Sequence, residues 1–309
     1  MTIAFTFPGQ GSQSVGMGRA LADAYPAANA VFAEVDEALG EKLSAIIFDG
    51  PDDALTRTAN TQPALMAVSL AAMRAMEAEG AAITDAAMVA GHSLGEYSAL
   101  AAAGALSISD AAKLLRLRGE AMQRAVPEGE GAMAALLGLD VAAAEEVAAA
   151  AGDVCDVAND NAPGQVVVSG SRAAVERAAE IAKEKGAKRA ILLPVSAPFH
   201  CRLMAPAADA MREALAGVTI KAPAVPLIAN VTAGPLTDPD AIRESLVAQV
   251  TGRVRWRESV IAMAAAGVTE LFEIGAGKVL TGLVKRIDRA LTARAINTAD
   301  DVAGIKAAP

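Results

Sequence analysis

The chain has 309 residues, and its hydrophobic content of 53% is ample for a buried core in one large or two smaller domains. Only 3% of the residues are aromatic and the formal net charge is −9, which argues against nucleic-acid binding, because such proteins present stacking platforms or a broad basic surface. No apolar run is long enough for a membrane span, no basic residue precedes Arg19 as a signal peptide would require, and two lone cysteines, Cys155 and Cys201, fit a reduced cytoplasmic protein.

Strands that end abruptly in glycine-rich turns and lead into helices recur along the chain. The first unit is a strand over 3–7, a loop over 8–13 and helical patterning over 18–39. Two later units repeat this order, with strands over 86–90 and 268–274 and helices over 96–103 and 279–286. Such alternation favours a parallel sheet that helices cover on both faces.

The pattern changes between about residues 128 and 194, where strand, helix, strand, strand, helix and strand follow one another. The expected strands are 132–139, 154–158, 165–169 and 189–195, and the expected helices are 141–151 and 172–185. This βαββαβ order is the signature of a ferredoxin-like unit. The sequence therefore predicts an α/β fold with a large α/β-hydrolase-like domain, formed by residues 1–127 and 195–309 around a mostly parallel sheet, plus an inserted ferredoxin-like α+β subdomain over 128–194. We expect residues 159–164 to form a turn-rich loop that faces a cleft.

The segment Gly91-His92-Ser93-Leu94-Gly95 fits the G-x-S-x-G elbow, in which a serine sits on a sharp turn between a strand and a helix. The turn exposes the serine hydroxyl above the sheet, and the amide of Leu94 in the first helical turn points toward a developing oxyanion. Five letters alone are weak evidence, but a strand before them and a helix after them favour Ser93 as a nucleophile over a plain tight turn.

A serine nucleophile needs a base, and the chain has only two histidines, His92 and His200. His92 is adjacent to Ser93, where side chains diverge, so we expect it to shape the turn or line the pocket. His200 follows the insertion, in a proline-punctuated segment, and is the expected base, although a structural core histidine is the alternative. Because serine precedes histidine and no acid is evident, we expect a dyad whose imidazole is oriented by a backbone carbonyl.

Arg118 is out of place on the helix predicted over 108–125. A helical wheel puts the other polar side chains on one face, but Arg118 falls among alanine, leucine and methionine side chains. An unpaired buried guanidinium would cost several kcal/mol, so an inward arginine requires a carboxylate. That carboxylate is either an internal Asp or Glu or the carboxylate of a substrate, which a guanidinium binds with two parallel hydrogen bonds.

Two glycine-containing segments imitate nucleotide-binding loops. Gly9-Gln10-Gly11 follows a strand, but Ser14 stands where a dinucleotide loop has its third small residue. Gly277-Lys278 lacks both the earlier glycine and the following Ser or Thr of a phosphate-binding loop, so we expect its glycines to turn a strand into a helix. No cluster of metal-ligating residues has the required spacing, and we expect no metal.

Taken together, these motifs resemble the malonyl-CoA:acyl carrier protein transacylases of bacterial fatty acid synthesis. The resemblance covers nearly the whole chain and is specific because many short motifs occur jointly. They are residues 5–13, 60–64, 91–97, the arginine of 116–119, 158–159 with 163–170, His200, and 273–280. The family usually has proline where this chain has Ala276, which bears only on the rigidity of that turn.

The resemblance implies a ping-pong acyl transfer. His200 would activate Ser93 to attack malonyl-CoA, and the phosphopantetheine thiol of acyl carrier protein would then take the malonyl group from the serine. The amides of Gln10 and Leu94 would form the oxyanion hole, Arg118 would hold the free carboxylate, and a main-chain carbonyl at Gln249 would orient His200. The family implies no bound cofactor. We expect a cytoplasmic monomer that binds neither nucleic acid nor membrane.

Selectivity and docking follow from the same resemblance. Phe199 is typical of malonyl-selective rather than methylmalonyl-selective acyltransferases, because a bulky ring there would crowd an α-methyl group. An acidic carrier protein would need a local basic patch on this acidic chain. Two clusters are candidates, although either could be solvated surface charge: Lys183, Lys185, Lys188 and Arg189, or Arg253, Arg255 and Arg257.

Two other functional classes stay open at this point. A serine esterase or thioesterase would share the elbow, although the chain order and the insertion count against it. A catalytically silent binding subunit of a synthase complex would share the fold but would not form a covalent serine adduct.

Overall fold

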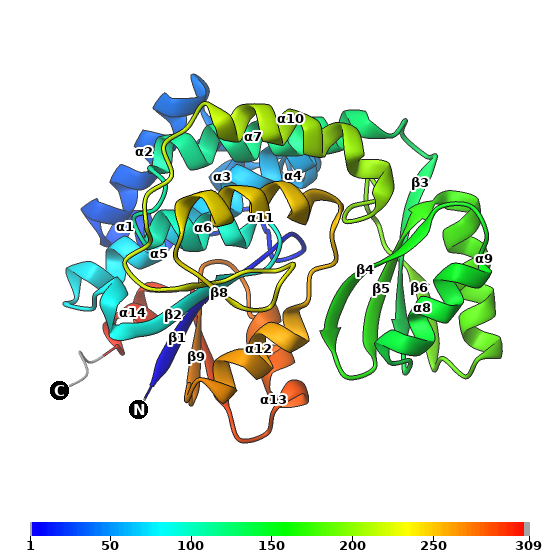
Figure 1. Cartoon of the computed structure of the whole chain (residues 1–309). Helices are drawn as coiled ribbons and strands as arrows, with labels where there is room; N and C mark the ends of the chain where they lie inside the picture. Colours follow the sequence, from blue (N-terminus) through cyan, green and yellow to red (C-terminus); the bar gives the residue numbers. More distant parts are fainter. Residues whose placement is uncertain (1, 306–309) are drawn as a thin grey trace.

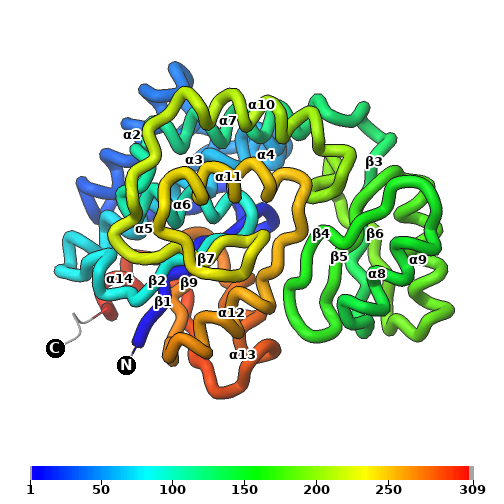
Figure 2. The backbone as a smooth tube through the Cα atoms, in the orientation of Figure 1, coloured from blue at the N-terminus to red at the C-terminus, as the bar shows by residue number. Residues whose placement is uncertain are grey.

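The computed structural model describes residues 2–305, which form two sheets of different kinds that lie side by side (Figures 1 and 2). The larger sheet has six strands in the order β10-β9-β1-β2-β7-β8, all parallel to their neighbours except the β7–β8 pair. Its strands are β1 (Ile3–Phe7), β2 (Ala86–Gly91), β7 (Leu227–Ile228), β8 (Pro235–Leu236), β9 (Glu270–Ile274) and β10 (Thr292–Ile296). The prediction of an α/β fold with a mostly parallel sheet is confirmed.

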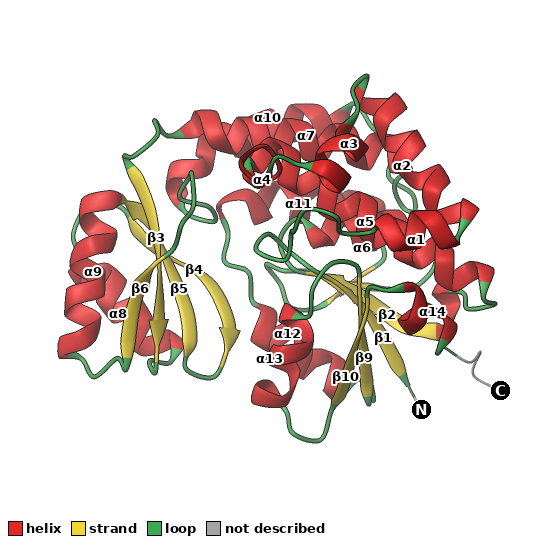
Figure 3. Ribbon diagram, turned by 180° about the vertical axis from the view of Figure 1, so that it is seen from behind, coloured by secondary structure: helices red, strands yellow, loops and turns green. Residues whose placement is uncertain are grey.

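Side-chain alternation along the central strands explains why helices cover both faces of this sheet (Figure 3). Phe5 and Val89 point into the larger hydrophobic cluster, which α5 and α6 help to build. Ala4 and Met88, one residue away, point into a second cluster that includes side chains of α12 and α13. Strands buried on both faces therefore read as continuous apolar runs.

The helices of this part are α1 (Arg19–Ala24), α2 (Pro26–Leu39), α3 (Leu43–Asp49), α4 (Asp52–Thr56), α5 (Thr58–Ala78), α6 (Gly95–Ala102), α7 (Ile108–Ala125), α10 (Ala205–Ala216), α11 (Pro239–Thr251), α12 (Trp256–Ala265), α13 (Val279–Ile287) and α14 (Ala299–Ala303). Helix α7 has its predicted bounds, and the Ser107 hydroxyl caps it by accepting from the Asp110 amide. The helical patterning expected over 18–39 corresponds to two helices, α1 and α2. The break between them falls at Tyr25, because Pro26 has no amide proton and opens α2. In the described part of the chain, no helix has the length and apolarity to cross a bilayer.

The smaller sheet is antiparallel, with strands in the order β4-β5-β3-β6. Its elements are β3 (Gly131–Leu137), α8 (Val141–Ala150), β4 (Cys155–Ala162), β5 (Gln165–Ser171), α9 (Arg172–Glu184) and β6 (Arg189–Leu192). They follow the βαββαβ order expected of the insertion, and α8 and α9 pack on one apolar face of the sheet. Figure 2 shows the chain returning from this unit, in yellow to red, to the part that began in blue.

One expectation in this unit was wrong. Residues 159–162 are not a loop but the end of β4, and only Pro163 and Gly164 remain as the turn. Asn159 and Asp160 pair with β5, and the Asp160 amide also donates to the Val254 carbonyl at 2.9 Å. Their turn propensity is overridden because both lie at a tertiary contact, where Asp160 is only 1% exposed.

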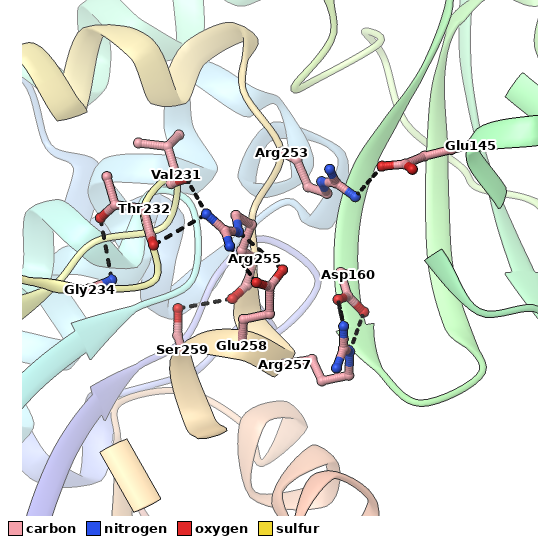
Figure 4. A network of polar contacts seen from close by, with 10 residues as sticks. All are labelled: Glu145, Asp160, Val231, Thr232, Gly234, Arg253, Arg255, Arg257, Glu258 and Ser259. Atoms are coloured by element: carbon pink, nitrogen blue, oxygen red, sulfur yellow. Dashed lines mark hydrogen bonds and ion pairs between the residues drawn. The ribbon is translucent and has the colours of Figure 1, made fainter. Parts of the chain in front are cut away.

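The same contact joins the two sheets' units along one side. The Val254 amide donates to the Ala158 carbonyl at 2.8 Å, which adds one rung of ladder beside β4. Arg257 forms an ion pair with the buried Asp160 at 2.8 Å, and Arg253 reaches Glu145 of α8 at 2.9 Å (Figure 4). These bonds fix β4 beside the segment that connects α11 to α12.

Candidate active site

Ser93 lies in the tight turn between β2 and α6, with a left-handed φ of 54°. The turn closes only because its ends are glycines. A Cβ at Gly91 would lie 1.9 Å from the Gly95 carbonyl group, and a Cβ at Gly95 would lie 2.3 Å from the Phe7 carbonyl oxygen. The strain that remains falls on Ser93, as is common at functional sites.

Asn230 holds this turn from the neighbouring strand. Its Oδ1 accepts from the Ser93 amide at 2.7 Å, and its Nδ2 donates to the Gly91 carbonyl at 2.6 Å. Asn230 is 1% exposed and comes just after β7, which pairs with β2. Sequence reasoning missed it. The available signal was a polar residue directly after a short apolar strand.

His200 is brought to Ser93 by the chain that returns from the smaller unit. Its Nε2 lies 2.7 Å from Ser93 Oγ, and its Nδ1 lies 2.9 Å from the Gln249 carbonyl oxygen and 3.2 Å from that of Gly252. Carbonyl oxygens only accept, so Nδ1 carries the proton and Nε2 offers a lone pair to the serine hydroxyl. Burial, and secondly the charge of Arg118, lower the pKa of His200 to about 3. The imidazole is therefore neutral at pH 7, as a general base must be.

Arg118 reaches the same serine from α7 and is 1% exposed. It donates through Nη1 to Gln62 Oε1 at 2.7 Å, and through Nη2 to Gln249 Oε1 at 2.8 Å and Ser93 Oγ at 3.2 Å. Within residues 2–305 these partners are all neutral, so the internal ion pair that the sequence left as an alternative does not form. The guanidinium is held in place with its charge available to an anion.

These three side chains line a cavity of about 450 Å³. Gln10 and Leu94 also line it, and their main-chain amides donate no hydrogen bond among the described residues. The Gln10 loop lies against the elbow, since a Cβ at Gly9 would come within 2.8 Å of the His92 carbonyl oxygen. The remaining wall is largely apolar, from Met122, Met133, Val167, Leu193, Pro194, Val195 and Phe199. The size suits a small acyl group with the arm of a thiol carrier.

His92 lines this cavity without contacting the Ser93 hydroxyl, as expected. Its Nε2 lies 2.8 Å from Asn161 Oδ1, and its ring packs beside Trp256 at 5.7 Å between centroids. Burial lowers its pKa. Asn161 and Asn159 also line the cavity, so the segment predicted to face a cleft does so, as part of a strand.

The remaining motifs have structural explanations. Gly275 and Gly277 both have positive φ, at 124° and 77°, where β9 turns toward α13. Cys155 and Cys201 are free and buried, and burial raises the pKa of Cys155 to about 12 and that of Cys201 in the same direction. Among residues 2–305, no group of three or more His, Cys, Asp or Glu could hold a metal ion.

Known proteins are similar to this chain over nearly its whole length. A family model described as the acyl transferase domain matches residues 4–302. A malonyl CoA-acyl carrier protein transacylase of Escherichia coli K12 is 52% identical over 298 residues, which cover 95% of each chain. The crystal structure of an acyl-carrier-protein-S-malonyltransferase from Bartonella henselae is 58% identical, with a TM-score of 0.96 over 98% of each chain. A structure of a type II PKS acyl-carrier protein in complex with its malonyl-transacylase matches with 44% identity and a TM-score of 0.95, over 98% of each chain.

Proposed function

The chain belongs to the acyl transferase domain family, and on that premise we propose that it transfers the malonyl group of malonyl-CoA to the phosphopantetheine thiol of acyl carrier protein. The observation that carries this proposal is the neutral Ser93–His200 pair beside a buried guanidinium that forms no direct ion pair within residues 2–305. A nucleophile and an anion holder within hydrogen-bonding distance of each other fit an acyl group that ends in a carboxylate.

In the first half-reaction, Ser93 Oγ attacks the thioester carbonyl while His200 Nε2 takes the hydroxyl proton. The C–S bond then breaks, and the histidine returns the proton to the departing thiolate of CoA, which leaves a malonyl ester on the serine. The amides of Gln10 and Leu94 stabilise the oxyanion, and each such donor typically contributes about 10²–10³-fold in rate. Their lack of other partners supports this role.

In the second half-reaction, the carrier thiol attacks the malonyl ester. His200 takes the thiol proton and gives it to Ser93 Oγ as the ester bond breaks, so the free enzyme is regenerated. The Gln249 carbonyl holds Nδ1–H throughout and keeps Nε2 directed at the serine. Arg118 binds the malonyl carboxylate, which fixes the acyl group for the thiol while water has no comparable position.

Phe199 makes the site selective for malonyl groups over α-methylated acyl groups in this scheme. Its ring lies in the cavity wall immediately before His200 and is 9% exposed. A methyl group on the α-carbon would have to share that space, which an overpacked site resists.

For carrier docking, the structure favours one of the two basic clusters. Arg253, Arg255 and Arg257 each form an ion pair, with Glu145, Glu258 and Asp160 (Figure 4). In the other cluster, Lys183 and Lys185 pair with Glu180 and Glu146, but Lys188 and Arg189 line an open groove between α9 and the edge strand β6 and form no ion pair within the described chain. We therefore propose that the carrier protein docks on the smaller unit. We also propose that the enzyme is a cytoplasmic monomer.

The decisive experiment is covalent labelling. The protein is incubated with radiolabelled malonyl-CoA without acceptor, and the label is located by peptide mass. We expect malonate on Ser93, its loss in Ser93→Ala, and its transfer to added carrier protein. Ser98→Ala is the matched control, because Ser98 is buried on α6, the helix that follows Ser93, and its hydroxyl has no partner within residues 2–305. Rapid release of free malonate would indicate a thioesterase, and no label would indicate a silent binding subunit.

A further inference from the structure

Glu96 is a buried carboxyl group that the proposed reaction does not use. It lies on α6, three residues after Ser93, and is 0% exposed. Its Oε2 accepts from Gln249 Nε2 at 2.8 Å and from the Asn230 amide at 3.1 Å. Its Oε1 has no partner in the described chain. A buried carboxylate without an ion pair is costly, so its presence behind the nucleophile calls for an explanation.

The side chain of Gln249 connects this carboxyl group to the substrate-binding guanidinium. Its Oε1 accepts from Arg118, while its Nε2 donates to Glu96 and also to the Ser93 carbonyl at 2.9 Å. The Gln249 amide can bridge Arg118 and Glu96 in one orientation only. Its Oε1 must face Arg118, which can only donate, and its Nε2 must face the Glu96 and Ser93 oxygens, which accept. Glu96 therefore fixes the amide that fixes Arg118.

The charges around Glu96 are few. Among residues 2–305, Arg118 on α7 is the one cation that acts on it, Tyr97 is its titratable neighbour on α6, and His200 beyond Gln249 is neutral. The Glu96 carboxylate therefore balances Arg118 in the empty site. When a malonyl carboxylate binds Arg118 directly, two anions face one cation, and the one on the fully buried Glu96 is disfavoured.

We propose that Glu96 is a positioning residue that acts as the counter-ion of Arg118 in the empty site and takes up one proton from solvent when the malonyl carboxylate replaces it. This inference rests on the proposed malonyl transfer and on Arg118 as the group that binds the carboxylate. Burial raises the pKa of Glu96 to about 7 in the free enzyme, so the exchange is within reach at neutral pH. A second anion beside Arg118 raises that pKa further.

Titration calorimetry on Ser93→Ala tests the exchange without turnover. Malonyl-CoA and CoA are each titrated at pH 7 and pH 8 in two buffers of different ionisation enthalpy, which gives the protons taken up on binding. From a free pKa of about 7, we expect malonyl-CoA to take up roughly half a proton more than CoA at pH 7, and close to one more at pH 8. CoA corrects for the phosphates that both ligands share.

Two substitutions identify the group that takes up the proton. Adding Glu96→Gln to Ser93→Ala should abolish the extra uptake, because the amide cannot titrate. Adding Glu96→Leu, a buried apolar side chain, should do the same. In the enzyme with Ser93 intact, Glu96→Leu should raise the KM for malonyl loading about tenfold, since Gln249 Nε2 loses one of its two acceptors. Glu96→Gln should rescue the KM, because an amide oxygen can still accept.

The outcomes separate this inference from the function beneath it. Tighter binding of malonyl-CoA than of CoA, without extra proton uptake, overturns the counter-ion exchange and leaves malonyl recognition intact. Extra uptake that persists in Glu96→Gln assigns the proton to another group and also overturns it. Equal binding of the two ligands refutes carboxylate recognition, and the inference falls with it.

Discussion

Substitution of Asn230 by alanine tests whether the strained turn at Ser93 is held from the neighbouring strand. The change removes the acceptor of the Ser93 amide and the donor to the Gly91 carbonyl, at 2.7 and 2.6 Å. Each polar group left unpaired costs about 1–3 kcal/mol, so we expect the free energy of unfolding to fall by about 3 kcal/mol. Without this support Ser93 is free to relax from its φ of 54°, and a displacement of about 1 Å costs about 10²-fold in the loading rate.

Two measurements on one protein preparation check this prediction. Urea unfolding gives the stability, and the rate of malonyl loading from radiolabelled malonyl-CoA gives the geometry. Asn297→Ala is the matched control, because Asn297 also donates to a glycine carbonyl, that of Gly277 at 2.9 Å, but lies away from the cavity. We expect it to cost about 1 kcal/mol and to load normally. If Asn230→Ala resembled the control in both measurements, the elbow would be held by its glycines alone and our reasoning would be wrong.

Three further predictions address substrate recognition, the protonation of His200 and the ion pairs that join the two units. Arg118→Ala should lower the ratio of malonyl to acetyl loading by about 10²-fold and Arg118→Lys by less, and an unchanged ratio in the alanine variant would remove Arg118 from carboxylate recognition. Because the pKa of His200 is about 3 in the folded protein, the rate of malonyl loading should show no acidic limb near pH 6.5. An unfolded histidine titrates near ~6.5, so the urea midpoint should fall as the pH drops below that value, and His200→Ala should lose that part of the pH dependence. Arg257→Ala should destabilise the protein by about 2–3 kcal/mol because it leaves Asp160 buried and unpaired, whereas Arg253→Ala, whose partner is half exposed, should cost under about 1 kcal/mol in the same urea assay.

The parts of the site that could be predicted from the sequence are those determined by nearby residues. The Ser93 turn follows from two glycines within five positions, and the inward direction of Arg118 follows from the periodicity of a single helix, whose bounds were predicted correctly. His200 could be proposed by elimination, because the sequence has only one other histidine. Each of these inferences needed no knowledge of what lies across the sheet.

The parts that were missed depend on contacts between distant segments. Asn230 meets Ser93 across 137 positions, and the Gln249 side chain meets Arg118 across 131, so no local pattern marks either. Gln249 was anticipated only for its carbonyl, and only through a family resemblance. The error over residues 159–162 has the same origin, since pairing with β5 and with Val254 overrides the turn propensity of that segment.

Because the active site is assembled from distant segments, its parts leave the ribosome at different times during synthesis. The serine emerges 107 positions before its base, and the base emerges before the carbonyl that orients it. A nascent chain therefore carries a serine that cannot yet react with thioesters, and it becomes competent only after the segment ending near Gly252 has folded back. Because Ser93 and His200 lie on opposite sides of the exposed turn of residues 127–130, the protein can be cut there into two fragments. Neither fragment would react alone, and activity would report that the two had associated.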